Sequence, residues 1–152
     1  MLDICLLGTG GMMPLPYRWL TSMMARCDGS SLLIDCGEGT QTRLFRCGIS
    51  PLRLGTVFLT HLHGDHVYGL FGLMSTLGLL GRRTPLKIFA PRPFDRILAS
   101  HLSFFDSKLP YEVQWEEIDT RAHRLLYENK TLEVWSIPLR HRVPAAGFLF
   151  RE

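Results

Sequence analysis

Thr60-His61-Leu62-His63-Gly64-Asp65-His66 sets three histidines and one aspartate side by side along the chain. The run before them, residues 54–59, is short and apolar, which predicts a buried strand. Residues two apart point the same way along an extended backbone, so His61 and His63 can converge on one cation at the strand end. On a helix the same two side chains would diverge. The spacing therefore indicates a metal site where a strand gives way to a loop.

A helix is expected directly after this segment. Apolar residues recur with helical spacing over residues 67–80, and Gly64 allows a sharp turn into the helix. Asp65 and His66 then lie at the helix N-terminus, displaced from the first pair of imidazoles. They can face a second cation beside the first, so this geometry suggests two metal ions.

Imidazole and carboxylate groups are ligands that suit Zn²⁺, Mn²⁺ or Fe. Two such ions ~3.5–4 Å apart stabilise both the attacking and the leaving oxygen in phosphoester hydrolysis. The alternative is a solvated, histidine-rich surface loop. Four potential ligands between a strand and a helix favour the metal site.

Four runs of the chain together resemble one family. The run His61-Leu62-His63-Gly64-Asp65-His66 after a strand is similar to the signature of the metallo-β-lactamase superfamily. Within that superfamily the chain resembles ribonuclease Z, the endonucleases that mature tRNA 3′ ends, over residues 2–150. The runs that carry the resemblance are Leu7-Gly8-Thr9-Gly10-Gly11, Ile34-Asp35-Cys36-Gly37-Glu38-Gly39-Thr40-Gln41, Thr60-His61-Leu62-His63-Gly64-Asp65-His66-Val67-Tyr68-Gly69-Leu70 and Pro138-Leu139-Arg140-His141.

The resemblance implies a role for each candidate ligand. His61, His63 and His141 would bind one metal ion, while Asp65 and His66 would bind the second, and Asp65 would also accept a proton. It implies two Zn²⁺ per complete site, with Mn²⁺ or Fe as alternatives. The implied activity is that of a metal-dependent endoribonuclease that removes the 3′ trailer of precursor tRNA, with metal-bound hydroxide hydrolysing the phosphodiester.

His141 also fits a ligand role by its position. It follows a predicted strand over residues 132–137, which we expect Pro138 to end, so it too lies where a strand gives way to a loop. Arg140 and Arg142 flank it and are the arginines that we would first test for contact with phosphate.

The predicted elements favour an α+β fold, a metallo-β-lactamase-like αββα sandwich, with a mixed sheet and helices on one of its faces. In the fold that it resembles, a second half packs sheet against sheet and supplies a bridging aspartate and a final histidine. The chain reaches Glu152 without them, so we expect residues 1–152 to be the N-terminal portion of one such domain. Its uncovered sheet face would favour a homodimer or higher oligomer.

Two other functions stay open at this point. Members of the superfamily hydrolyse other esters and phosphodiesters with the same ligands, and the fold alone does not choose among the substrates. The chain can also be a catalytically incomplete fragment that self-associates and binds at most one metal ion. The runs around Asp65 and His141 favour ribonuclease Z.

Composition sets the class of the protein. At 152 residues and 46% hydrophobic content, the chain can bury a core as one domain. A net charge of +3 does not by itself indicate a nucleic-acid partner. Four cysteines without Cys-x-x-Cys spacing, and no secretion signal, predict free thiols in the cytoplasm. The longest apolar stretch falls short of the ~20 residues of a membrane span, which predicts a soluble protein.

The remaining pattern predicts further elements and some side-chain roles. The glycine-rich loop 8–11 is expected to turn tightly near the cleft, since prolines follow where a phosphate-binding helix would begin. Asp35 is expected either to bond a ligand imidazole or to cap a turn. His101 and His123 are expected to have packing or surface roles. Strands are expected over residues 2–7, 23–26, 31–35, 86–90, 111–118 and 147–150, and helices over 38–47 and 94–104. The strands 23–26 and 31–35 are expected to form a hairpin around Asp28-Gly29, and the strands 132–137 and 147–150 to complete the sheet.

Overall fold

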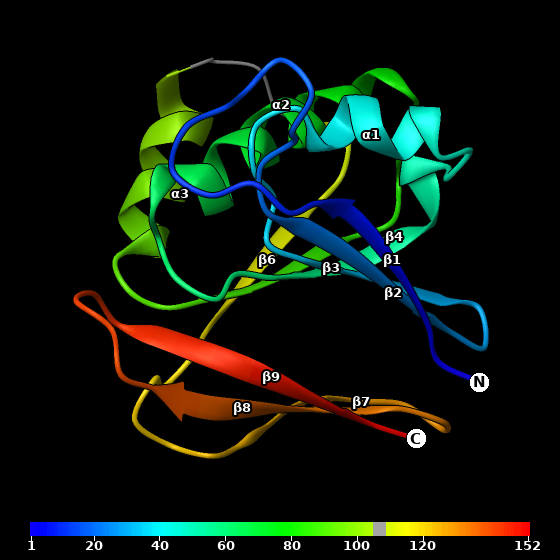
Figure 1. Ribbon diagram of the computed structural model, residues 1–152. Helices are drawn as coiled ribbons and strands as arrows, with labels where there is room; N and C mark the ends of the chain where they lie inside the picture. The colour runs from blue at the N-terminus through cyan, green and yellow to red at the C-terminus, as the bar shows by residue number, and fades with distance from the viewer. Residues whose placement is uncertain (105–108) are drawn as a thin grey trace.

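The computed structural model describes residues 1–104 and 109–152. Over these residues the chain forms a six-stranded large sheet (β1–β6), a three-stranded small sheet (β7–β9) and the helices α1–α3 (Figure 1). The helices cover one face of the large sheet, and the small sheet lies against the other face. The elements are β1 (Asp3–Gly8), β2 (Ser22–Cys27), β3 (Ser30–Ile34), α1 (Thr40–Arg46), the 3₁₀ turn η1 (Pro51–Arg53), β4 (Leu54–Phe58), α2 (Gly64–Leu79), β5 (Leu86–Ala90), α3 (Phe94–Phe104), β6 (Val113–Glu117), β7 (Leu125–Glu128), β8 (Glu133–Leu139) and β9 (Ala145–Arg151).

The strand order of the large sheet brings candidate ligands to one edge. Strands β1, β2 and β3 pair antiparallel, whereas β3, β4, β5 and β6 pair parallel. The carboxyl ends of parallel strands meet at the same edge, and the segment with His61 and His63 follows β4 there. The predicted hairpin between β2 and β3 is confirmed: Asp28 and Gly29 have φ of 44° and 85°, as a two-residue turn requires.

Helix α2 buries its apolar face against the large sheet. It begins at Gly64, earlier than the helical spacing predicts, so Asp65 and His66 lie in its first turn as expected. Its buried face consists of Val67, Leu70, Leu73, Met74 and Leu77. Within the described residues, no helix combines the length and the hydropathy that crossing a membrane requires.

The small sheet is the main difference from the sequence prediction. The prediction that residues 132–137 and 147–150 complete a single sheet is wrong. These residues belong to β8 and β9, which form a separate sheet with the unpredicted strand β7. This sheet packs on the large sheet at Phe58. The Phe58 ring stacks on Phe89 of β5, with ring centroids 4.9 Å apart, and its centroid lies 5.2 Å from that of Phe148 of β9. Alternating apolar residues indicate a buried face, but not which sheet a strand joins. The chain itself thus supplies part of the second layer of strands.

Strand β8 continues to Leu139, so the prediction that Pro138 ends it is wrong. Pro138 lies opposite Ala146 of β9. The pairing of β7 with β8 reaches Trp135, and one further backbone bond joins Ser136 to Arg124, so among the described residues no strand flanks the other side of Pro138. A proline, which has no N–H to donate, is tolerated at such an edge.

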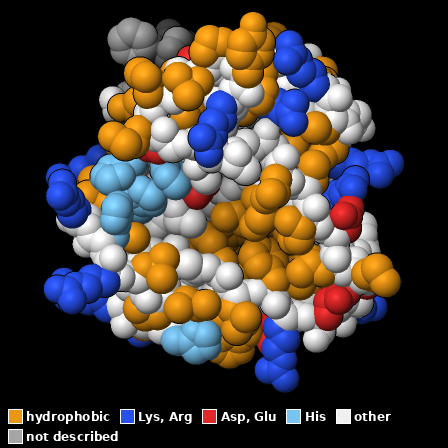
Figure 2. All heavy atoms as spheres, in the orientation of Figure 1, with side chains coloured by type: hydrophobic (Ala, Val, Ile, Leu, Met, Phe, Trp, Pro, Cys, Tyr) orange, Lys and Arg blue, Asp and Glu red, His pale blue; other side chains and the backbone are white. Residues whose placement is uncertain are grey.

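Apolar side chains stay exposed where the small sheet does not reach. Leu2 packs into the core between the sheets, and Ile4 and Leu6, on the same face of β1, are 45% and 61% exposed. Figure 2 shows hydrophobic side chains gathered in a hollow between the two sheets. The uncovered sheet face that the sequence predicts is therefore limited to the region of β1, because the small sheet covers the centre.

Candidate metal centre

Two loops bring three histidines together at the junction of the sheets. His61 and His63 lie between the end of β4 and the start of α2, and His141 lies in the turn between β8 and β9. The backbone N–H of Ala146 donates to the carbonyl of Thr60 at 2.9 Å, which ties β9 to the first loop. Figure 2 shows histidine side chains gathered between the helical layer and the small sheet.

The three imidazoles have the geometry of a metal site. One ligand nitrogen from each of His61, His63 and His141 lies within 4.8 Å of the others. The ring centroid of His141 lies 4.9 Å from that of His61 and 5.2 Å from that of His63. Nε2 of His61 lies 3.0 Å from Nδ1 of His63. Three imidazoles around one tetrahedral ion with Zn–N distances of ~2.0–2.1 Å form a familiar zinc site that leaves one position open.

His61 is held in the form that binds metal. Burial, and then the nearby positive charge of His66, lower the pKa of His61 to about 4. The ring is therefore neutral near pH 7, as a metal ligand must be.

Asp65 and His66 lie beside the three imidazoles, in the first turn of α2. Oδ2 of Asp65 lies 3.6 Å from Nε2 of His66, and the rings of His66 and His61 have centroids 4.0 Å apart. Burial tends to raise the pKa of Asp65, but the backbone N–H of Met12, which donates to Oδ2 at 2.7 Å, and the charge of His66 lower it overall. Asp65 is thus an ionised carboxylate that faces the cluster.

Asp35 fixes the orientation of His66. It is 2% exposed and has φ of 56°, and its carboxylate accepts hydrogen bonds from Thr60 N at 2.8 Å and Thr60 Oγ1 at 2.9 Å. Nδ1 of His66 lies 2.7 Å from Oδ2 of Asp35. Burial opposes the charged form of His66, but the bond to Asp35 and its charge raise the pKa of His66 overall. Of the two roles expected for Asp35, the bond to an imidazole is confirmed.

A cleft of about 770 Å³ opens beside the metal centre. The expected proximity of the glycine-rich loop to the cleft is confirmed, since Met12 and Pro14, which follow the loop, line the cleft. Sequence reasoning misses Met12 and Tyr68, because neither belongs to a ligand pattern. Arg142 lines the cleft, whereas Arg140 does not. The lining residues are Met12, Pro14, Leu20, Glu38, His63, Gly64, Asp65, Tyr68, His141 and Arg142.

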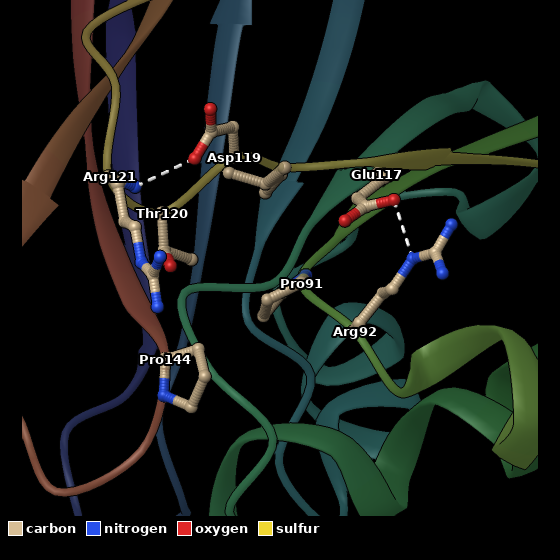
Figure 3. Close-up of a pocket in the computed structure, with 8 residues that line it drawn as sticks. Pro91, Arg92, Glu117, Asp119, Thr120, Arg121 and Pro144 are labelled. Atoms are coloured by element: carbon tan, nitrogen blue, oxygen red, sulfur yellow. Dashed lines mark hydrogen bonds and ion pairs between the residues drawn. The ribbon is translucent and has the colours of Figure 1, made fainter.

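A smaller cavity of about 280 Å³ contains no histidine or cysteine (Figure 3). Arg92 Nε pairs with Glu117 at 2.6 Å, and the backbone N–H of Arg121 donates to Asp119 at 3.0 Å, so both carboxylates of this cavity already have partners. His123 lies elsewhere, stacked on Trp135 with ring centroids 5.2 Å apart, which confirms its packing role. The cluster around His61 is therefore the candidate functional site.

Comparison with known proteins agrees with this geometry. A family model described as Anti-Pycsar protein Apyc1 matches residues 2–105. A ribonuclease Z from Parabacteroides distasonis is 43% identical over 150 residues, which are 99% of this chain and 49% of that protein. The chain thus spans about half the length of the curated relatives that it matches.

Solved structures show the same likeness. The short form of human tRNase Z has a TM-score of 0.87 at 30% identity, over 100% of this chain and 65% of that one. The metallo-β-lactamase-fold protein YhfI from Bacillus subtilis has a TM-score of 0.77 at 17% identity, over 99% of this chain and 58% of that one, and shows the fold alone. The predicted likeness to ribonuclease Z and the predicted fold are confirmed.

Proposed function

We propose a function for this chain, which belongs to the family described as Anti-Pycsar protein Apyc1 and has the metallo-β-lactamase fold. The protein is a metal-dependent endoribonuclease that removes the 3′ trailer from precursor tRNA. The supporting observation is the cluster of His61, His63 and His141, whose ligand atoms lie within 4.8 Å of one another. The ribonuclease Z relatives cover 99% of the chain, whereas the family model ends at residue 105, before His141.

Two zinc ions fit the donor groups. The imidazoles of His61, His63 and His141 suit one ion, and the carboxylate of Asp65 with His66 suits a second; Mn²⁺ and Fe are alternatives with the same ligand preferences. When bound, the ions supply a nucleophilic water at neutral pH and neutralise charge on the phosphate.

The remaining steps belong to protein side chains. Asp65 is only 13% exposed and ionised, and the N–H of Met12 holds its carboxylate in place, so it can accept a proton within the cleft. Asp35 holds Nδ1 of His66, which leaves Nε2 directed toward Asp65 as a ligand atom. Arg142, at the cleft wall, can contact the phosphate of the substrate.

We infer that residues 1–152 are the N-terminal portion of the catalytic domain. Asp65 and His66 are two ligands, and two protein ligands hold an ion weakly unless further groups complete the coordination. The curated relatives are about twice as long as this chain, which leaves room for further ligands outside it.

The test is zinc content and cleavage of precursor tRNA, measured together. We expect His63→Ala to lose zinc and any metal-dependent cleavage, while His101→Ala on α3 retains both. Cleavage that survives in His63→Ala would place the active site elsewhere. Hydrolysis of a generic phosphodiester without cleavage of precursor tRNA would favour the alternative, a metallo-β-lactamase-fold hydrolase with another ester or phosphodiester substrate.

A second candidate is an incomplete fragment that self-associates as a homodimer or higher oligomer. Ile4 and Leu6, which are 45% and 61% exposed on one face of β1, favour it. We expect Ile4→Lys with Leu6→Lys to lower the mass in solution to that of a monomer, whereas Leu79→Lys, at an 87% exposed site on α2, leaves it unchanged. A wild-type chain that is already monomeric at 50 μM would refute self-association.

The cytoplasm is the proposed location. Cys5, Cys27, Cys36 and Cys47 are all free thiols, which fits a reducing compartment.

A further inference from the structure

Two arginines stack on one indole beside the N-terminal loop. Arg43 and Arg46 are three positions apart in α1, and their guanidinium carbons lie 5.9 Å and 5.4 Å from the centre of the Trp19 ring. Residues three apart lie on the same face of a helix, so the two charges point to one region of the surface. We call Trp19, Arg43 and Arg46 the arginine–tryptophan patch.

The charge of this patch is not balanced by the protein. Within residues 1–104 and 109–152, no carboxylate forms an ion pair with Arg43 or Arg46. Arg92, by contrast, pairs with Glu117. Arg43 donates from Nε to the carbonyl of Leu7 at 2.9 Å, and its terminal nitrogens stay available. Like charges held side by side repel, so an anion that bridges them would be favourable.

The patch borders the cleft that contains the metal centre. Trp19 packs against Gly39, where a Cβ would lie 2.4 Å from the indole carbon Cζ3, so the indole occupies the space of a side chain. The chain neighbours of these two residues, Glu38 and Leu20, both line the cleft. Figure 2 shows Lys and Arg side chains gathered over α1, on the upper right of the molecule. A single strand of a polymer could therefore lie across the patch and enter the cleft.

We propose that the arginine–tryptophan patch binds the phosphodiester backbone of RNA next to the bond that is cleaved. This inference rests on the proposed function and names a binding surface for its substrate. A guanidinium can donate two parallel N–H bonds to two oxygens of one phosphate, and Arg46 has all of its N–H groups available for this. Trp19 is a positioning residue, because its ring holds both guanidiniums by cation–π contact and presents them to solvent.

The experiment measures RNA binding separately from cleavage. An RNA hairpin with a fluorescent label and a single-stranded 3′ tail is titrated with the chain in EDTA, from 0.05 to 0.2 M NaCl, and anisotropy is recorded. Each lost contact with a phosphate of a single strand should reduce the steepness of the plot of log K against log salt by about 0.7, and the affinity at 0.15 M salt by roughly fourfold. Arg46→Gln should change the slope and the affinity by the amount expected for one lost contact. The double variant Arg43→Gln with Arg46→Gln should change them by the amount expected for two. Trp19→Leu should lower the affinity by an intermediate amount.

Matched controls separate binding from structure. Arg83→Gln, at an exposed arginine without an ion pair among the described residues, should leave the salt slope unchanged. If the two arginines only stabilise the C-terminal turn of α1, Arg46→Gln will lower the melting temperature without changing the slope, and the inference is overturned. Absence of RNA binding at 0.05 M NaCl overturns it too, as does arginine-dependent binding to anionic phospholipid vesicles that RNA does not compete away.

The two proposals can fail independently. Arginine-dependent RNA binding by a chain that never cleaves precursor tRNA, even with zinc restored, upholds the patch and refutes the nuclease assignment for this chain. Cleavage with unchanged binding in both arginine variants upholds the nuclease and refutes the patch.

Discussion

Replacing Phe58 by alanine should both destabilise the fold and weaken zinc binding. The Phe58 ring is 0% exposed, stacks on Phe89 at 4.9 Å and meets Phe148 at 5.2 Å, so it joins the two sheets. His141 follows β8 of the small sheet, whereas His61 follows β4 of the large sheet. Loosening the contact between the sheets should therefore misplace one ligand relative to the others.

The expected cost follows from the contacts that are lost. A buried phenylalanine replaced by alanine costs about 3–5 kcal/mol of unfolding free energy, because apolar contacts are lost and a cavity remains. Each close aromatic pair adds ~0.5–1.5 kcal/mol beyond burial, so Phe58→Ala should lie near the upper end, at about 4–5 kcal/mol. We also expect zinc affinity to fall by ~10-fold, since a displacement of even ~1 Å spoils coordination.

Urea unfolding followed by circular dichroism, and zinc competition with a chromogenic chelator, measure the two effects. Phe45→Ala on α1 is the matched control, because its side chain is 52% exposed and its loss should cost less than ~1 kcal/mol. Phe58→Leu, which refills most of the cavity, should recover more than half of the stability. A loss below ~1 kcal/mol for Phe58→Ala would mean that the small sheet does not pack on this ring, and would refute the reasoning.

Two further predictions concern single groups near the centre. Asp35→Asn should lower the affinity for the second zinc ion, the one assigned to Asp65 and His66, by about 10–100-fold, since the amide cannot hold His66 in the same ring orientation. Isothermal titration measures this, and Asp28→Asn, at another aspartate with positive φ, should leave zinc affinity unchanged. Burial raises the pKa of Cys36 to about 12, so at pH 8 its thiol is protonated and should resist iodoacetamide until pH approaches 12 or the chain unfolds. The exposed Cys47 should be alkylated within minutes at pH 8, and mass spectrometry showing equal modification of both thiols in the folded chain would contradict this.

Local patterns account for most of the elements and for the ligand cluster. Two histidines at a period of two after a run of apolar residues indicate a strand end, and they lie just beyond β4. The turn at Asp28-Gly29 and the first turn of α2 also follow from residue type alone. In each case the information lies within a few neighbouring residues, where sequence and conformation are directly linked.

The sequence does not predict which segments far apart in the chain contact one another. The sequence predicts strands at β8 and β9, but the pairing of β8 with β7 depends on residues such as Leu125, in a segment for which the sequence predicts no strand. Met12 is the clearest case at the site. Its backbone N–H reaches Asp65 across 53 positions of the chain, and a backbone group carries no residue-specific signal.

The position of His141 explains why the chain supplies three ligands to one ion, at His61, His63 and His141, but only two to the other, at Asp65 and His66. Its loop is carried by β8 and β9, and Ala146 of β9 donates to Thr60, the residue before His61, so the small sheet is needed to bring the third imidazole into place. All three imidazoles of that cluster therefore come from elements that this chain already contains. Asp65 and His66 are likewise oriented by the chain, through Met12 and Asp35, but they offer two ligands instead of three. A site with three preoriented donors binds zinc more tightly than one with two. We therefore expect the chain to take up one zinc ion tightly at the imidazoles, and a second ion only weakly until further ligands are supplied.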